Sequence, residues 1–190
     1  MRNRLTVWTL AVILLLGILS GCATDSSSSK QEQEAAEDIV LENGITVSGT
    51  VVSAAGKSID LSQKNEFVQS IVSCRWLEKN KVAVQCRVSG GKNQAYYFSV
   101  YDLVRDLYVY EQYGSQFIWQ NDDIDTLVYV LDYAGEGEPS QVKNKKDMVL
   151  YESDPKEQIC NIAFVPKGIK IELTDLQGNN PRQVIVDAAT

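Results

Sequence analysis

The densest group of oxygen-bearing side chains in the sequence is the run Asn121-Asp122-Asp123-Ile124-Asp125. Carboxylates this close together suit a hard cation such as Ca²⁺, which takes about 6 to 8 oxygen ligands. The spacing differs from that of a helix–loop–helix calcium loop, because the glycine and the glutamate of such a loop are missing. The alternative interpretation is a solvated turn between strands, in which Asn and Asp cap backbone groups. Asn121, Asp122, Asp123 and Asp125 are therefore a calcium candidate, and we prefer the turn.

Carboxylates in pairs could also hydrolyse a glycosidic bond, one as acid and the other as base or nucleophile. The available aspartates are Asp102, Asp106, Asp122, Asp123 and Asp125. With 25 acidic residues in the chain, some pair is expected by chance, and no spacing identifies one. The sequence contains no histidine, which excludes Ser-His-Asp and Cys-His catalysis and removes the commonest zinc ligand. We expect no enzyme activity, no bound metal and no cofactor apart from the lipid described below.

Three cysteines lie in the body of the chain, and none belongs to a Cys-x-x-Cys pair. Cys74 and Cys86 are centred on Asn80 in a polar turn, so a three-residue hairpin loop would place them directly opposite each other. Opposite positions favour a disulfide between Cys74 and Cys86, and the competing interpretation is two buried free thiols. Cys160 alternates with Ile162 and Phe164, which predicts a buried free thiol.

Tyrosine is concentrated in one part of the sequence, since six of the nine lie between Tyr96 and Tyr113. Exposed tyrosines make rigid anchors for a glycan or a protein partner. The candidates for such anchors are Tyr97, Tyr101, Tyr108 and Tyr110. The simpler interpretation, which we prefer, is packing within a β-sheet, because tyrosine is common in strands.

The N-terminus has the organisation of an export signal. Arg2 and Arg4 precede an uncharged run from Leu5 to Leu19. As a helix this run would measure roughly 22 Å, which is short for a bilayer core of about 30 Å but suits the apolar region of a signal peptide. The run ends in Leu19-Ser20-Gly21-Cys22, with small residues before a cysteine.

This ending resembles the lipobox of bacterial lipoproteins. The resemblance covers residues 1–22 and implies a signal peptide of residues 1–21, a diacylglyceryl group on the Cys22 thiol, cleavage before Cys22 and often acylation of the new amine. Two or three acyl chains anchor a protein stably without a spanning helix. The expected location is the extracytoplasmic face of the cell membrane, or the outer membrane in a bacterium with two. The alternative is an uncleaved signal anchor in which Cys22 is an ordinary thiol.

Residues 22–38 read as the lipidated cysteine and a flexible tether. The segment contains four consecutive serines, Ser26 to Ser29, and then a stretch rich in Gln and Glu, a composition that cannot offset the entropy cost of folding. Removal of residues 1–21 leaves 16 basic against 25 acidic side chains, a net charge of −9. This charge argues against nucleic acid as a partner, because phosphates demand Lys and Arg.

From Ile39 onward the sequence alternates with period two, which predicts strands. Asn43-Gly44 and Gly56 mark turns, and no stretch reads as a long amphipathic helix. In the segments 72–76 and 82–88 the apolar residues are all even-numbered, which predicts one buried face and one solvated face. Further strands are expected at 96–103, 107–113, 117–119, 126–133, 148–152, 159–165, 169–173 and 184–186. Residues 39–190 should therefore form a single all-β domain of antiparallel sheets.

A repeat runs through this region. An aromatic residue, a polar turn and an apolar strand follow one another at Trp76, Trp119 and Phe164, with spacings of 43 and 45 residues. The repeat is similar to the blades of β-propellers, which recur at about 40 to 50 residues. Residues 39–190 would make about 3.4 such blades, fewer than a closed propeller needs. A partial propeller, blades completed by oligomerisation and a β-sandwich all remain open.

Taken together, these features predict a lipid-anchored lipoprotein whose β domain binds or scaffolds another component of the envelope, with a protein or glycan as partner. The membrane is contacted through the acyl chains. The alternative is a carboxylate-dependent hydrolase acting on envelope polysaccharide. The sequence does not define an oligomeric state.

Overall fold

The computed structural model describes residues 39–41, 44–78 and 80–188. The predicted signal peptide, the lipidated Cys22 and the tether of residues 22–38 lie outside the described residues and stay predictions. Within the described ranges, no helix has the length and apolarity needed to cross a bilayer.

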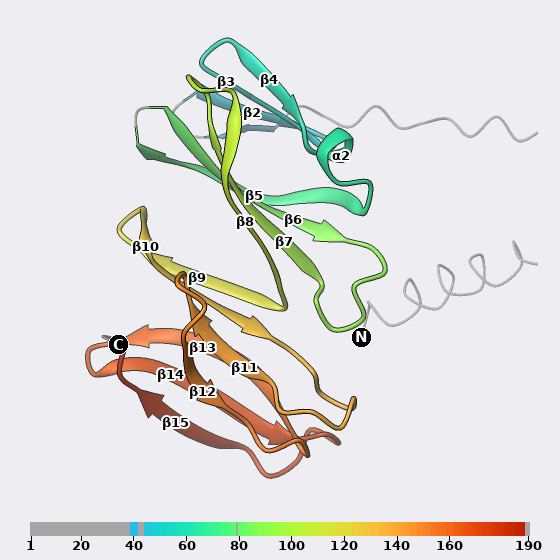
Figure 1. Cartoon of the computed structure of the whole chain (residues 1–190), viewed down its shortest axis with the longest axis vertical. Helices are drawn as coiled ribbons and strands as arrows, with labels where there is room; N and C mark the ends of the chain where they lie inside the picture. The colour runs from blue at the N-terminus through green and yellow to red at the C-terminus, as the bar shows by residue number, and fades with distance from the viewer. Residues whose placement is uncertain (1–38, 42–43, 79, 189–190) are drawn as a thin grey trace, which may run out of the picture. The chain divides into compact units, whose positions relative to one another are not determined.

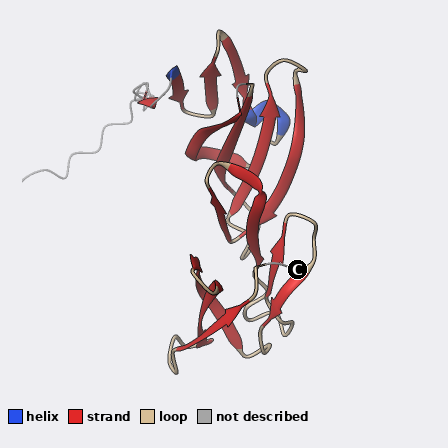
Figure 2. Cartoon of the chain, turned by 90° about the vertical axis from the view of Figure 1, so that its left-hand side faces the viewer, coloured by secondary structure: helices blue, strands red, loops and turns tan. Residues whose placement is uncertain are grey.

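The fold is all-β and antiparallel, as predicted, and its strands are grouped into four sheets that follow one another along the chain (Figures 1 and 2). Sheet A comprises β1 (Ile39–Leu41), β2 (Ile45–Ser48), β3 (Val51–Ala54) and β4 (Lys57–Asp60). Sheet B comprises β5 (Val68–Glu78), β6 (Lys81–Val88), β7 (Tyr96–Asp102) and β8 (Leu107–Gly114). Sheet C comprises β9 (Gln116–Gln120), β10 (Asp123–Leu131), β11 (Gln141–Asn144) and β12 (Val149–Glu152). Sheet D comprises β13 (Glu157–Val165), β14 (Gly168–Asp175) and β15 (Arg182–Val186).

Each sheet is a meander in which sequential strands are neighbours, so every connection within a sheet joins adjacent antiparallel strands, most of them by a short turn and β10 to β11 by the longer loop 132–140. Leu41 pairs with Ile45, and Ala54 pairs with Lys57 across Ala55-Gly56, so both predicted turn positions lie between paired antiparallel strands. One helical turn, α2 (Leu61–Lys64), connects sheets A and B, and the Asp60 side chain caps it by accepting from the Ser62 amide at 3.0 Å.

Three apolar clusters join the sheets in chain order. The A–B core packs Ile45 and Val52 of sheet A against Val82 and Val84 of sheet B. Half of the residues in the B–C core are aromatic, and the C–D core is mostly isoleucine and valine. The two inner sheets are therefore covered on both faces by neighbouring sheets. This arrangement has more than the two layers of a simple sandwich, and it is an open succession of blade-like meanders rather than a closed barrel.

The sequence repeat corresponds to equivalent hairpins. Trp76, Trp119 and Phe164 lie on β5, β9 and β13, the first strands of sheets B, C and D. In each case the next strand of the same sheet follows after a short turn. The spacing of 43 and 45 residues is therefore the spacing of whole sheets.

The predicted buried face of β6 is confirmed, because its even-numbered apolar residues are all buried, but the predicted solvated face is wrong at Ala83. Ala83 is buried like Val82 and Val84, because the odd-numbered face of β6 packs on sheet C. On β5 the even-numbered pattern also fails, since Val72 is 51% exposed. The reason is a bulge after Ile71, which shifts the inward positions of this strand by one residue.

Candidate functional site

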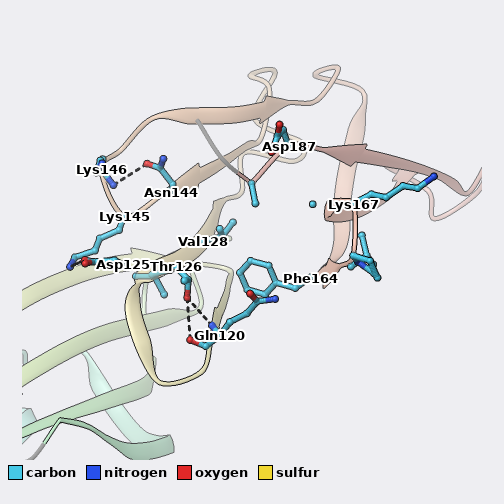
Figure 3. A pocket seen from close by; sticks show the side chains of 15 residues that line it. Gln120, Asp125, Thr126, Val128, Asn144, Lys145, Lys146, Phe164, Lys167 and Asp187 are labelled. Atoms are coloured by element: carbon cyan, nitrogen blue, oxygen red, sulfur yellow. Dashed lines mark hydrogen bonds and ion pairs between the residues drawn. The ribbon is translucent and has the colours of Figure 1, made fainter.

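The candidate site is a pocket of about 590 Å³ between sheets C and D, which we call the C–D pocket (Figure 3). This volume lies within the range typical of small-ligand sites, about 300 to 1,000 Å³. Four segments line the pocket: β10 with the end of β9, the turn between β11 and β12, the end of β13 with the turn that follows it, and the two residues Asp187 and Ala188 after β15.

The wall formed by sheet C is rigidly built. Thr126 accepts a hydrogen bond from the Gln120 amide at 2.8 Å and donates to the Asp123 carbonyl at 2.6 Å, which ties the ends of β9 and β10 together. Lys145 donates its backbone N–H to the Leu127 carbonyl at 2.9 Å. This bond holds the β11–β12 turn against β10, so the backbone that carries the lysines of the turn is held in place.

The β11–β12 turn is shaped by one side chain. The Asn144 side-chain oxygen accepts from the backbone N–H groups of Lys146 at 2.9 Å and Met148 at 3.1 Å. Asp147 takes a positive φ of 62° within the same turn, and its carboxylate accepts from the Tyr129 hydroxyl. These contacts fix the backbone that places Lys145 and Lys146 at the pocket.

The opposite wall is the β13–β14 turn, formed by Pro166 and Lys167 between Val165 and Gly168. Gly168 is required there, because a β carbon on it would lie 2.0 Å from the Val186 carbonyl oxygen. Phe164 precedes the turn, and Figure 3 shows its ring directed into the space between the two walls. The ring provides an apolar surface on which a flat group could pack.

Basic side chains outnumber acidic ones among the described residues that line the C–D pocket. Lys145 pairs with Asp125 at 2.5 Å, and this hydrogen bond and charge lower the pKa of the Asp125 carboxyl. The other lysines, Lys146 and Lys167, form no ion pair with any described residue. Asp187 contributes the remaining formal charge, so three lysines face two aspartates at one site of a chain with a net charge of −7.

The predicted calcium candidate is a turn. Asn121 and Asp122 form the β9–β10 hairpin loop with φ values of 52° and 54°, as a two-residue loop between paired strands requires. Asp123 accepts from the Asp125 amide, Asp122 lies 3.4 Å from Arg75, and Asp125 pairs with Lys145. Among the described residues, no group of three acidic, cysteine or histidine side chains could hold a metal ion. Of the four candidates only Asp125 lines the C–D pocket.

The other two aspartates considered for hydrolysis, Asp102 and Asp106, accept hydrogen bonds near the β7–β8 turn. Asp102 accepts from the amides of Val104 and Arg105 at 3.0 and 2.9 Å and shapes the β7–β8 turn. Asp106 accepts from the Tyr101 hydroxyl. The hydrolase alternative stays a prediction, and these contacts give it no site.

The predicted disulfide is not present, because the predicted register is wrong. Cys74 pairs with Val84 and Cys86 pairs with Ile71, since β5 bulges between Ile71 and Ser73. The two cysteines are thus diagonal neighbours, for which a separation of about 7–8 Å is typical, against a β-carbon separation of about 3.8 Å in a disulfide. Both thiols are free, and burial raises the pKa of each to about 12, so neither is a nucleophile at neutral pH.

Cys160 is exposed, contrary to the prediction of a buried thiol. A bulge between Ile159 and Asn161 places Ile159 and Ile162 in the C–D core. The thiol of Cys160 lies instead on the outer side of sheet D, 3.2 Å from the Thr174 hydroxyl.

The four tyrosines considered as binding anchors belong mainly to the sheet packing. Tyr97 and Tyr101 are buried in the A–B core, and Tyr108 packs edge-on against Tyr101 with ring centroids 5.0 Å apart. Tyr110 packs against Phe98 on the opposite face of sheet B. All four tyrosines therefore pack within the sheets, as the preferred interpretation holds, and Tyr97 also borders a cavity.

Sequence reasoning missed the lysines and Phe164 of the C–D pocket. A signal was present in Asn144-Lys145-Lys146 and in Pro166-Lys167-Gly168, two basic turns of the kind that end strands. The chain matches no known protein-family model and no curated protein.

Proposed function

We propose that this protein is a lipid-anchored extracytoplasmic lipoprotein whose β domain binds an anionic component of the cell envelope in the C–D pocket. The observation that supports the binding site is the combination of Lys146 and Lys167, which lack ion-pair partners among the described residues, with the ring of Phe164 between them. Ammonium groups bind phosphate or carboxylate, and an aromatic face packs against an adjacent apolar group.

The anchor rests on the sequence alone. An uncharged run that ends in Leu19-Ser20-Gly21-Cys22, followed by a polar tether, is typical of a lipoprotein precursor. The lipid would hold the β domain at the membrane surface, and the net charge of −9 on the mature chain would keep the body of the domain away from anionic headgroups.

Metabolic labelling with a fatty acid tests the anchor. Wild-type protein should incorporate label and fractionate with membranes, and Cys22→Ala should lose both properties. Cys160→Ala removes another exposed thiol and should label like the wild type. Unchanged labelling of Cys22→Ala would refute the lipoprotein assignment.

Binding of phenyl phosphate tests the pocket, because this probe combines a dianion with an aromatic ring. We expect the full-length protein in detergent to bind it, and the double variant Lys146→Gln, Lys167→Gln to bind about tenfold more weakly, a change of about 1.4 kcal/mol. The double variant Lys92→Gln, Lys156→Gln removes the same charge elsewhere and should bind normally. Equal weakening in both double variants, or no binding by the wild type, would contradict the proposed site.

A further inference from the structure

A second cavity, of about 460 Å³, lies where the connection from α2 to β5 meets β7 and β8. We call it the Phe67–Tyr113 pocket. Phe67 is 50% exposed and Tyr113 is 41% exposed, so two aromatic rings border the cavity with much of their surface free. Exposed aromatic side chains that are held rigidly are a recurrent feature of binding sites.

One buried side chain fixes both aromatic residues. The Asn65 side-chain nitrogen donates to the Tyr113 hydroxyl at 2.6 Å, and the Asn65 side-chain oxygen accepts from the Phe67 backbone N–H at 3.1 Å. The backbone of Asn65 is also bonded, to the Leu61 carbonyl and the Val68 amide, each at 3.0 Å. The Tyr113 ring and the backbone that carries Phe67 are thus positioned before any ligand arrives, which lowers the entropy cost of binding.

The Tyr113 ring is also held in place by a contact with another tyrosine of sheet B. Tyr113 packs against Tyr97 with ring centroids 5.2 Å apart and planes tilted by 48°. The Tyr97 hydroxyl donates to Glu111, and burial together with this bond raises the pKa of Tyr97, so the phenol keeps its proton. Glu111 is in turn 3.7 Å from the Lys64 ammonium.

The polar groups that line the Phe67–Tyr113 pocket can form hydrogen bonds with the hydroxyl groups of a ligand. The Tyr113 hydroxyl accepts from Asn65 and so retains its own hydrogen for a ligand acceptor. The Glu111 carboxylate is 37% exposed and can accept from a ligand hydroxyl, and the Gln112 side chain also lines the cavity. Lys64 is the one basic residue among those that line the cavity and Glu66 and Glu111 are acidic, so the cavity does not select an anion as the C–D pocket does.

A neutral saccharide matches this set of groups. A sugar ring presents an apolar C–H face, which packs on an exposed aromatic ring, and hydroxyls at its edge, which pair with carboxylate, amide and phenol groups. A protein partner would need a larger area, since stable interfaces bury about 800 Å² on each side, and here charged residues surround only two exposed rings. We infer that the Phe67–Tyr113 pocket is a saccharide-binding site, with Phe67 as the stacking surface and Tyr113 and Glu111 as hydrogen-bonding groups.

Saturation-transfer NMR and calorimetry on the full-length protein in detergent test this inference. The probes are tri-N-acetylchitotriose and maltotriose, which are neutral and so do not report on the C–D pocket. We expect at least one of them to bind with a dissociation constant of about 1 mM, corresponding to about −4.1 kcal/mol. Phe67→Ala and Phe67→Leu should both weaken binding at least about fivefold, because leucine keeps an apolar surface but lacks a flat face.

Tyr113→Phe tests the hydroxyl separately, since it keeps the ring, and should weaken binding about threefold. Met148→Ala removes an exposed apolar side chain of sheet C and should bind normally. Two results would overturn the inference: binding by Phe67→Ala equal to that of the wild type, or no binding of either probe. A photo-crosslinker at Glu66 that captures a protein chain, without saccharide binding, would likewise assign the pocket to a protein partner instead.

Discussion

The inner sheets B and C differ from the outer sheets A and D in how many faces they bury. In sheet B, Val84 faces sheet A and Phe98 faces sheet C, and both are fully buried. In sheet C, Tyr129 and Val130 divide in the same way between the B–C and C–D cores. The central strands of an inner sheet therefore have little solvated surface on either face, and they need apolar residues at consecutive positions.

The outer sheets have one apolar face and one polar face. On sheet A, Thr46, Ser53 and Ser58 form the row opposite the core, and the hydroxyls of Ser53 and Ser58 lie 2.8 Å apart. On sheet D, Lys170 donates to Glu172 at 2.7 Å on the side away from the C–D core. Polar outer faces of this kind cap repeat proteins, so the succession of sheets ends without needing another blade.

The two pockets lie beside the outer members of this arrangement. The C–D pocket is bordered by the turns of sheet D, and the Phe67–Tyr113 pocket by the connection from sheet A. We infer that sheets B and C form the rigid scaffold on which the less buried outer elements complete the two proposed binding pockets.

The largest expected effect is at the B–C core. Phe98 is fully buried and packs on Phe117 and Trp119, with ring centroids 5.3 and 5.1 Å away. Phe98→Ala should lower the free energy of unfolding by about 3–5 kcal/mol in urea denaturation. Ile185→Ala, on the outer side of sheet D and 53% exposed, should change it by less than about 0.5 kcal/mol. Similar losses in the two variants would contradict the difference between inner and outer faces.

A smaller effect is expected where sheets B and C approach through their backbones. A β carbon on Gly114 would lie 2.9 Å from the Val130 carbonyl oxygen and 3.0 Å from the Phe117 ring. Gly114→Ala should destabilise by about 1–3 kcal/mol, because two sheets must move apart. Thermal unfolding measures this, and a variant as stable as the wild type would show that the contact can relax freely.

Arg75 connects the inner sheets at their edge and should contribute less. Its guanidinium lies 4.5 Å from the Trp119 ring centroid and 3.4 Å from Asp122, and both charged groups are about half exposed. Arg75→Ala should cost about 0.5–1 kcal/mol. Arg87→Ala is the matched control, since Arg87 stacks at 6.0 Å on Tyr96 of its own sheet and should cost less. An equal cost for both would remove Arg75 as a link between the sheets.

The smallest expected effect is on the loss of stability at low pH. The amides of Arg105 and Val104 hold the pKa of Asp102 below its usual value. The folded state therefore favours the ionised carboxylate, whose contribution is complete above the unfolded pKa and is lost as pH falls through the folded pKa. Unfolding of Asp102→Asn between about pH 5 and pH 2 should show a shallower loss of stability than the wild type. Parallel pH curves would show that the ionised Asp102 does not stabilise this turn.

The period-two pattern predicted most of the strands, because each has at least one face that must be apolar, but β3 was not among the predicted segments. β11 was missed since Val142 is its only apolar residue, and its place in the sheet depends on pairing with β10. The cysteine register was also wrong, because the bulge after Ile71 leaves no mark in the composition.

The candidate site was harder to predict than the fold. Lys145 and Lys167 are 22 positions apart in the sequence and lie on different sheets, so only the packing of sheet D on sheet C brings them to one pocket. The tyrosines could not be assigned from sequence either. Alternation indicates which residues share a face, but only the stacking of sheets on both sides of sheet B shows that Tyr97 and Tyr110 are both covered.

Native-state hydrogen exchange of the full-length protein tests most directly whether sheets B and C form the rigid scaffold. Central strands are the matched comparison, because edge strands exchange early in any sheet: β7 and β10 represent the inner sheets, and β3 and β14 the outer sheets. We expect amides of β7 and β10 to exchange through global unfolding, and those of β3 and β14 to exchange at least about tenfold faster through local opening. Protection in β3 or β14 that equals or exceeds that in β7 and β10 would contradict the account.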